Sequence, residues 1–417
     1  MSELELGGVP ATRLAEEFGT PLYVYEADVI ARRARAYLAG LESYPGASRA
    51  VYACKANATV AVIGAVVGEG LGADVASAGE LAAALRAGAQ PADIVVHGNN
   101  KSDADLAAAV DAGCGLVAVD HLGELEQLDR IAAAAGRVQP VLVRVTPGID
   151  ADTHDKIRTG HHGSKFGFAP PDALDALDQA DALLHLSPAG LHVHLGSQIR
   201  DLSTYAEAVD WLVEFIEANG LGELPVLDLG GGLGIAHVEG EVELDIQASV
   251  EALCARLTDG LIAHGLQMPE LVLEPGRSIV GPAGTTLYRV GAIKRAADGT
   301  VYAAVDGGMA DNPRPALYDA RYAAVVADRP EAAADRDYTI AGKHCESGDV
   351  LIERIRLPEL RPGDVLAVPA TGAYNASMAS TYNLLPRPAA VMVTGGEARL
   401  IQRRETVDDL LTRDVDG

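Results

Sequence analysis

Residues 50–88 read AVYACKANATVAVIGAVVGEGLGADVASAGELAAALRAG and set out a unit that recurs along the chain. The apolar run 51–55 has the character of a strand, and the Ala/Val-rich stretch 60–67 that follows has that of a helix. The pair 72–76 and 79–87 repeats this order. Strands that alternate with helices form right-handed βαβ units around a parallel sheet.

The alternation continues to about residue 280. Strands are predicted at 51–55, 72–76, 94–98, 116–120, 141–145, 190–194, 226–229 and 271–274. Helices are predicted at 60–67, 79–87, 102–112, 123–134, 171–182, 204–219 and 248–263. Eight strands favour a (β/α)8, TIM-like barrel over an open doubly wound sheet.

Beyond residue 280 the pattern changes to short strands separated by Gly-, Pro- and Asp-rich turns. They are predicted at 285–294, 301–306, 323–326, 337–341, 349–356, 364–368 and 389–394. This is typical of an all-β domain, and the strand-like PLYVY segment (21–25) is expected to join it. We therefore predict a barrel over 29–280 and a discontinuous β-barrel or β-sandwich domain over 1–28 and 281–417.

Composition excludes several classes of function. The 417 residues carry 33 Lys and Arg against 59 Asp and Glu, a net charge of −26, which disfavours nucleic acid and anionic membranes as partners. The acidic N-terminus has no apolar signal-peptide core, and no apolar run is long enough to span a membrane, so a cytoplasmic location is expected. The four cysteines are far apart, which indicates neither a zinc site nor a disulfide framework.

Active sites of such barrels lie at the C-terminal ends of the strands. The first predicted strand ends in YACKAN (52–57). The amine of Lys55 suits covalent attachment of a carbonyl compound, because a partly desolvated ammonium loses its proton more easily. A solvated lysine that only caps the strand is the alternative. Asp74 and Ser77, after the second strand, are either site residues or helix caps.

Three later strand ends are also distinctive. HVHLGSQ (192–198) places His192 and His194 on one face. They suit stacking on a flat cofactor or metal binding, for which no third ligand is evident. LGGGLG (229–234) can bring backbone N–H groups close to a phosphate, although glycines also serve plain turns. EPGR (274–277) offers an acid and a guanidinium, as an ion pair or as partners of a ring nitrogen and an anion. Together these groups meet the needs of pyridoxal 5′-phosphate (PLP).

In the order YACKAN, HVHLGSQI, LGGGLG, EPGR, CESGD (345–349) and GAYNASMASTYN (372–383), the chain closely resembles the PLP-dependent decarboxylases of barrel-plus-β-domain type. The diaminopimelate decarboxylase branch is the most similar, over roughly residues 20–400. KIRTG (156–160) with SKFG (164–167), and CESGD, favour diaminopimelate over ornithine or arginine. The resemblance implies PLP fold type III and conversion of meso-2,6-diaminopimelate to L-lysine and CO2, the last step of lysine biosynthesis.

The resemblance also implies a role for each site residue. Lys55 would hold PLP covalently, His194 would stack on its ring and Glu274 would face the pyridine nitrogen. The remaining cofactor contacts would come from Asp74, Ser197, Gly231, Gly232, Gly276, Arg277 and Tyr374. The substrate would contact Arg277, Arg314, Tyr318, Glu346 and Tyr374.

Catalysis would end with protonation of Cα by Cys345, since a thiol can act as an acid near neutral pH. In this family Cys345 and Glu346 come from the other subunit, which implies a homodimer with shared active sites. No metal is implied. Two positions depart from the family pattern: Asn375-Ala376 after Tyr374, and His192 where Ser is frequent. Neither is expected to touch a residue with a chemical role.

Three rival functions remain open. An amino-acid racemase of the same fold needs two bases on opposite faces of Cα, and the Cys345–Glu346 pair and the paired arginines argue against it. A decarboxylase of another diamino acid, or of a carrier-tethered one, would keep the same cofactor site. A non-catalytic PLP carrier would not need a β domain that carries substrate groups.

Overall fold

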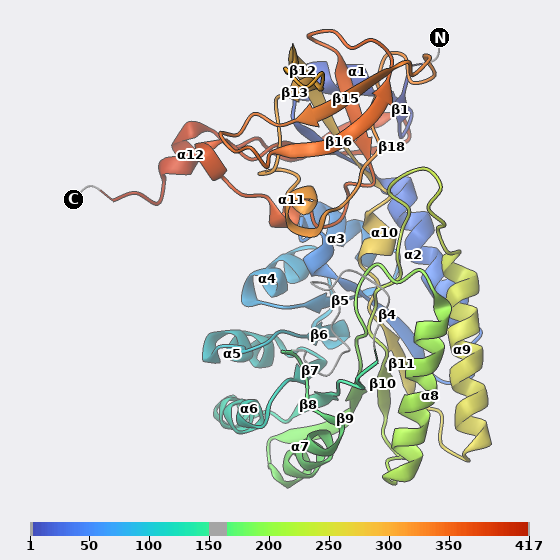
Figure 1. The fold of residues 1–417 in the computed structure, drawn as a ribbon. Coiled ribbons are helices and arrows are strands. Elements are labelled where there is room, and N and C mark those ends of the chain that lie inside the picture. The colour runs from blue at the N-terminus through green and yellow to red at the C-terminus, as the bar shows by residue number, and fades with distance from the viewer. Residues whose placement is uncertain (1–2, 150–164, 416–417) are drawn as a thin grey trace. The chain divides into compact units, whose positions relative to one another are not determined.

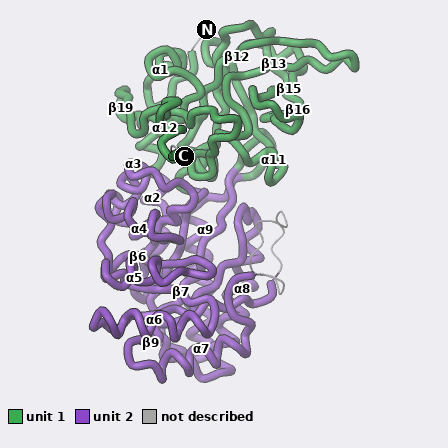
Figure 2. The backbone as a smooth tube through the Cα atoms, turned by 90° about the vertical axis from the view of Figure 1, so that its left-hand side faces the viewer, with its two compact units in different colours: residues 1–30, 236–242, 279–417 green, residues 31–235, 243–278 purple. Residues whose placement is uncertain are grey.

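The computed structural model describes residues 3–149 and 165–415. These residues form two compact units, one of residues 31–235 and 243–278 and the other of residues 1–30, 236–242 and 279–417. Figure 2 shows the first unit in purple and the second in green. We call them the barrel unit and the β unit. The short segment 236–242 interrupts the barrel unit in sequence and belongs to the β unit.

The barrel unit contains a closed barrel of eight parallel strands, which confirms the predicted fold class. In chain order the strands are β4 (Ser48–Ala53), β5 (Gly72–Val75), β6 (Ile94–Val96), β7 (Leu116–Val119), β8 (Gln139–Arg144), β9 (Leu186–His192), β10 (Val226–Asp228) and β11 (Glu270–Leu273). The ring closes where β11 pairs with β4.

Helices follow the strands and lie outside them (Figure 1). They are α2 (Ala27–Leu41), α3 (Val60–Val67), α4 (Ala78–Arg86), α5 (Asp103–Ala112), α6 (Leu122–Ala134), α7 (Pro170–Ala182), α8 (Leu202–Ala218) and α9 (Ile246–Ala263). Local sequence fixes their ends. In α5, Ser102 and Asp105 form a capping box at the start, and Gly113 ends the helix in the left-handed conformation that glycine adopts without strain.

The β unit is built on one large sheet in the order β16-β15-β13-β12-β3-β18-β19. Its strands are β3 (Leu22–Glu26), β12 (Gly284–Arg295), β13 (Val301–Val305), β14 (Val325–Val326), β15 (Arg336–Ala341), β16 (Val350–Leu357), β17 (Val365–Pro369), β18 (Ala389–Thr394) and β19 (Glu397–Gln402). A small hairpin, β1 (Glu5–Leu6) and β2 (Val9–Pro10), precedes α1 (Ala11–Phe18). The other helical segments are α10 (Arg277–Val280), α11 (Arg314–Tyr318), η4 (Ala376–Met378), η5 (Tyr382–Leu384) and α12 (Val407–Leu411).

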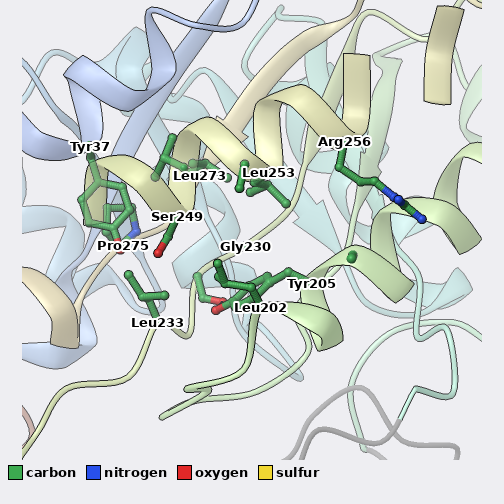
Figure 3. A pocket seen from close by; sticks show the side chains of 14 residues that line it. Tyr37, Leu202, Tyr205, Gly230, Leu233, Ser249, Leu253, Arg256, Leu273 and Pro275 are labelled. Carbon is green, nitrogen blue, oxygen red and sulfur yellow. The ribbon is translucent and has the colours of Figure 1, made fainter. Parts of the chain in front are cut away.

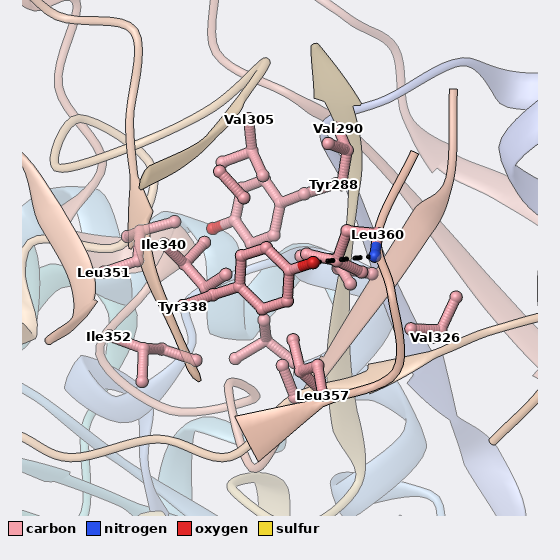
Figure 4. Close-up of a cluster of buried hydrophobic side chains, with 14 of the residues drawn as sticks. Tyr288, Val290, Val305, Val326, Tyr338, Ile340, Leu351, Ile352, Leu357 and Leu360 are labelled. Carbon is pink, nitrogen blue, oxygen red and sulfur yellow. Dashed lines mark hydrogen bonds between the residues drawn. The ribbon is translucent and has the colours of Figure 1, made fainter. Parts of the chain in front are cut away.

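The PLYVY segment joins this sheet as predicted. It forms β3, which lies between β12 and β18 and pairs with both. Further along, an apolar cluster packs around Tyr288 and Tyr338, both buried (Figure 4). The Tyr338 hydroxyl accepts a hydrogen bond from the Leu360 N–H at 3.0 Å, so its polar end is satisfied inside the core.

The structure differs from the sequence prediction in a few elements. Lys55 lies in a 3-10 turn, η1 (Cys54–Ala56), rather than at the end of the strand itself. The strand predicted at 323–326 is reduced to the two residues of β14. Helices α1 and α2 and strand β19 were not predicted. The segments KIRTG (156–160) and Ser164 lie outside the described residues. Within the described ranges, no helix has both the length and the hydropathy of a membrane span.

Candidate active site

The C-terminal ends of the barrel strands carry a layer of polar side chains above an apolar one. Val95, Leu142, Val226 and Val272 belong to one buried cluster in the barrel. Alternate residues of a strand face the same side, so the residue two positions after each of these also faces the barrel interior. In each case this residue is polar. Those residues are His97, Arg144, Asp228 and Glu274, and His192 is the register partner of both Arg144 and Asp228.

Lys55 stands at this end of the barrel with its side chain 40% exposed. Its Nζ lies 3.4 Å from the Oδ2 of Asp74, whose side chain is buried. Burial raises the pKa of Asp74, and the nearby Lys55 ammonium lowers it in part. Ser77 is a helix cap, since its hydroxyl accepts from the Glu80 N–H at the start of α4. The structure therefore separates the two residues that the sequence left open: Asp74 pairs with Lys55, and Ser77 caps.

Glu274 is buried between two histidines. The Nε2 of His97 contacts its Oε1, and the Nε2 of His192 lies 3.5 Å from its Oε2. Burial alone would raise the pKa of Glu274, but His97 and His192 outweigh it and hold the pKa well below the usual range. The expectation that His192 touches no residue of chemical importance was wrong. His97, at the end of the predicted strand 94–98, was missed.

His194 is half-buried, and its Nδ1 accepts a hydrogen bond from the Gly231 N–H at 3.2 Å. Burial lowers the pKa of its imidazole well below the usual value, and the Lys55 and Arg144 charges lower it further. The ring is therefore neutral at pH 7. It lies nearly parallel to the His192 ring, at 10° with centroids 6.4 Å apart. A neutral, flat ring of this kind suits stacking on an aromatic cofactor.

The glycine turn after β10 is closed to any side chain. A Cβ on Gly231 would lie 2.0 Å from the Glu274 carbonyl oxygen, and one on Gly232 would lie 2.3 Å from that of Gly196. Gly232 also has a φ of +114°, which only glycine adopts readily. Nearby, a Cβ on Gly276 would be 3.0 Å from that of Ala53. The close approach of these backbone segments therefore requires glycine, as in the glycine-rich turns that bind phosphate.

Arg277 is buried at the start of α10, beside this turn. Its Nε and Nη2 lie 3.3 and 3.0 Å from the Ser197 hydroxyl. The sequence predicted both residues as site residues, and the structure brings them together. A guanidinium is suited to binding a carboxylate or a phosphate.

A cavity of about 200 Å³ lies behind the glycine turn, between α8, α9 and the strand ends (Figure 3). Its lining is mainly apolar and includes Tyr205, Leu253 and the backbone of Gly230. The Tyr205 hydroxyl donates to the Gly231 carbonyl at 3.2 Å. Lys55 and His194 are not among its lining residues, so this cavity backs the glycine turn rather than forming the polar end of the barrel.

The β unit carries the other predicted site residues. Arg314 is buried at the start of α11, where its Nη1 donates to the Tyr322 hydroxyl at 2.6 Å and lies 2.9 Å from the Nε2 of His237. The Tyr322 hydroxyl in turn lies 3.5 Å from the side-chain amide of Asn375. The departure at Asn375 therefore contacts a partner of Arg314, although not Arg314 itself. Tyr318 ends α11 and is half-buried.

Cys345 and Glu346 are exposed, whereas Cys54, Cys114 and Cys254 are buried; all four thiols are free. Residues 382–383 form hydrogen bonds to Cys345 and Glu346. The Cys345 N–H donates to the Asn383 side chain at 3.0 Å, and the Tyr382 hydroxyl donates to a Glu346 carboxylate oxygen at 3.3 Å.

Two further features complete the β-unit groups. His344, next to Cys345, stacks on Tyr382 at 5.9 Å and 9° and pairs with Asp349 at 2.8 Å. Tyr374 is half-buried and adopts a φ of +60°. The β unit thus presents an acid and a thiol from one loop, at Cys345 and Glu346, and a buried guanidinium from α11.

An amine, an ionised buried acid, a neutral imidazole and a glycine turn at the end of a (β/α)8 barrel define a class of protein that binds PLP. The family model "Pyridoxal-dependent decarboxylase, pyridoxal binding domain" matches residues 27–281, and the chain belongs to this family. It is a PLP-dependent carboxy-lyase of barrel-plus-β-domain architecture, and its cofactor is PLP.

Within the family, the chain belongs with the diaminopimelate decarboxylases. It is 43% identical over 417 residues to diaminopimelate decarboxylase of Bacillus subtilis, covering 99% of this chain and 95% of the relative. Identity to the enzyme of Actinosynnema pretiosum is 46% over 416 residues, with coverages of 99% and 93%. A crystal structure of diaminopimelate decarboxylase from M. jannaschii in complex with L-lysine matches with a TM-score of 0.90, 33% identity and coverages of 98% and 94%.

Proposed function

We propose that the chain decarboxylates meso-2,6-diaminopimelate to L-lysine and CO2, the last step of lysine biosynthesis. The observation that carries the chemistry is Glu274, a buried carboxylate held ionised at the end of the barrel. PLP, when bound, accepts the electron pair left at Cα as the carboxylate departs, and an acid beside the ring nitrogen keeps the ring able to do so. The names of the curated relatives support the choice of substrate.

The residues of the barrel unit fit this cofactor. Lys55 would hold it through its amine, with Asp74 as the counter-charge 3.4 Å away. His194 would stack on the ring, and Glu274 would face the ring nitrogen. The phosphate would be held by backbone N–H groups and polar side chains of Ser197, Gly231, Gly232, Gly276, Arg277 and Tyr374.

The substrate would be fixed at its unreactive end. Arg277, Arg314 and Tyr318 would bind the distal carboxylate, Glu346 would bind the distal ammonium, and Tyr374 would reach the substrate or the phosphate. Arg314 is held by the Tyr322 hydroxyl at 2.6 Å, which limits the positions of its guanidinium. A site that pairs an anion and a cation with one carbon of the substrate discriminates against ornithine and arginine, which lack that carboxylate.

Cys345 would supply the final proton. Its thiol would donate to Cα after CO2 has left, and the resulting thiolate would be reprotonated from solvent, to which Cys345 is exposed. The thiol is the only exposed one of the four. Lys55 would hold the cofactor before and after each turnover, with Asp74 beside its amine.

We further propose that the working form is a cytoplasmic homodimer in which Cys345 and Glu346 complete the site of the partner. The exposure of both side chains supports this arrangement. The cofactor domain is proposed to span 29–280, and the β domain 1–28 and 281–417.

The test is release of CO2 and lysine by the purified protein with added PLP, with meso-diaminopimelate, ornithine, arginine and lysine assayed in parallel. Turnover of diaminopimelate alone is expected. Turnover of another diamino acid instead would overturn the roles of Arg314 and Glu346. Exchange of the Cα hydrogen without CO2 release would favour a racemase. Analytical ultracentrifugation, together with recovery of activity on mixing Lys55→Ala and Cys345→Ala proteins, tests the shared site.

A further inference from the structure

The polar layer of the barrel contains a cluster of four residues, of which only Glu274 has a role in the reaction proposed above. His97, His192, Asp228 and Glu274 are all buried, and one potential ligand atom of each lies within 4.8 Å of the others. The two histidine rings are in contact, with centroids 4.6 Å apart at 55°. Four groups of these types in one place can serve either as metal ligands or as a hydrogen-bonded set around an acid.

The contacts favour the hydrogen-bonded set. Zinc–ligand bonds of ~2.0–2.1 Å in a tetrahedron place neighbouring ligand atoms roughly 3.3 Å apart. The Nε2 of His97 and the Oε1 of Glu274 lie closer than this, in direct contact. An ion therefore does not fit between them without moving both. The arrangement instead places one imidazole Nε2 beside each oxygen of a buried carboxylate.

His97 is fixed in place by its own surroundings. Its N–H donates to the Val75 carbonyl of the neighbouring strand at 2.8 Å. The loop that follows is held by Lys101, whose buried Nζ donates to the carbonyls of Gly98 and Ala118, both at 2.8 Å, and pairs with Glu124 at 2.6 Å. A buried lysine with three partners is a rigid support, so the His97 ring approaches Glu274 from a set direction.

The charges in the cluster are consistent with one anion. Burial lowers the pKa of His192 to about 3, so this ring is neutral and donates from one nitrogen only. Burial, reinforced by the Glu274 charge, raises the pKa of Asp228 well above its usual range. The opposite directions of these two pKa shifts make Glu274, rather than Asp228, the acid that ionises more readily in the cluster. The two imidazole nitrogens lie beside its oxygens and limit the positions that the carboxylate can take.

We propose that His97 and His192 are positioning residues that fix the Glu274 carboxylate between them and aim it at the ring nitrogen of PLP. This inference rests on the role proposed for Glu274 and extends it to two residues that would not touch the cofactor's reacting atoms. Each histidine acts through a different carboxylate oxygen, and loss of either should weaken the hold of Glu274 on the protonated ring. The effect should appear in the cofactor itself, before any substrate binds.

The experiment uses the holoenzyme reconstituted with PLP labelled with 15N at the ring nitrogen. The variants are His97→Leu and His192→Leu, with His97→Gln as a conservative rescue because an amide can still donate to the carboxylate. His185→Leu is the matched control. His185 also pairs with a carboxylate, Asp129 at 3.4 Å, but it lies outside the polar layer and is partly exposed. The readouts are the 15N shift of the ring, the affinity of the apoenzyme for PLP, and kcat and KM.

We expect each leucine variant to move the 15N signal toward that of an unprotonated ring. PLP affinity and kcat should fall roughly 10- to 100-fold, the factor for losing one hydrogen bond to a charged group, with KM changed less. His97→Gln should recover part of each change, and His185→Leu should match the unaltered protein.

An unaltered 15N shift in a folded leucine variant would overturn the proposal, whatever happens to turnover. If His97→Leu does not fold, the 15N shift of His192→Leu tests the proposal in its place. Because the 15N and affinity readouts need no substrate, they stand even if diaminopimelate is not turned over. Failure to turn over diaminopimelate would count against the proposed substrate and would not affect the role inferred for His97 and His192.

Discussion

Asp311 offers a quantitative test of the electrostatics in the β unit, and we predict that Asp311→Asn removes a pH-dependent destabilisation. The carboxyl is 5% exposed and accepts hydrogen bonds from the Tyr288 hydroxyl and from the Gly308 N–H. Burial is the main cause that raises its pKa to about 7, against the two hydrogen bonds that lower it; Asp349 and Asp306 add to the rise. The asparagine amide can satisfy both partners after rotation, since it accepts from one and donates to the other.

The sign of the effect follows from linkage. The pKa of Asp311 is higher in the folded chain than in the unfolded chain. Below the unfolded value of 3.8 the carboxyl is protonated in both states and does not lower the free energy of unfolding. As the pH rises from 3.8 toward the folded value near 7, the free energy of unfolding falls. At 1.36 kcal/mol per pKa unit, the cost is about 2 kcal/mol at pH 5 and about 4 kcal/mol at pH 8. Asp311→Asn should therefore gain roughly 2–3 kcal/mol relative to the unaltered protein between pH 5 and pH 8.

The assay is urea unfolding of both proteins at pH 5 and pH 8, at one fixed protein concentration. Hydrogen exchange of peptides from β15 and β16 assigns the change to the unit that contains Asp311. Asp335→Asn, an exposed acid in the same unit, serves as the control and should show no pH-dependent difference. A gain from Asp311→Asn that is the same at both pH values would refute the reasoning, because a packing effect does not titrate.

Three further predictions concern the site. Gly231→Ala should lower PLP affinity at least about tenfold in titrations of the apoenzyme, because its Cβ would meet the Glu274 carbonyl oxygen at 2.0 Å; unchanged affinity would contradict this. Asp228→Asn should keep at least about ten times the activity of Asp228→Ala, since an amide oxygen can still accept the hydrogen bond that the Gly230 N–H donates to Asp228 at 2.8 Å; equal loss of activity in both variants would contradict this. Tyr382→Phe removes the hydrogen bond to Glu346 and should raise KM for diaminopimelate about three- to tenfold, and an effect confined to kcat would rule out this role.

The architecture could be predicted from the sequence because the barrel repeats one local pattern. Alternation of apolar strands and Ala-rich helices requires no knowledge of distant contacts, and the eight strands were found with boundaries shifted by a few residues. The segment 236–242 could not be assigned in the same way. Its place in the β unit depends on contacts far along the chain, such as that between His237 and Arg314 at 2.9 Å.

The candidate site was predictable where a residue sits in a distinctive local sequence. Lys55, the glycine turn and Glu274 all stand out at the ends of predicted strands. His97 and Asp228 do not, because each is an ordinary residue at the end of a short apolar run. Their importance depends on the ring closure that brings β6, β9, β10 and β11 together at one level. Strand register, which local sequence does not specify, decides which polar groups meet.

The two units support their functional groups in different ways. The cofactor groups of the barrel unit stand at the ends of regular strands, whose positions the closed sheet fixes. Of the seven described non-glycine residues with positive φ, five lie in the β unit: Asp319, Ala370, Tyr374, Asn383 and Leu384. Such strained conformations persist where surrounding contacts hold them, and they concentrate in functional loops. Tyr374 is itself a proposed substrate contact, and Asn383 binds the backbone beside Glu346. Substitutions at Asn383 and Glu346 should therefore change substrate preference at little cost to PLP binding, whereas substitutions in the polar layer of the barrel should affect the cofactor first.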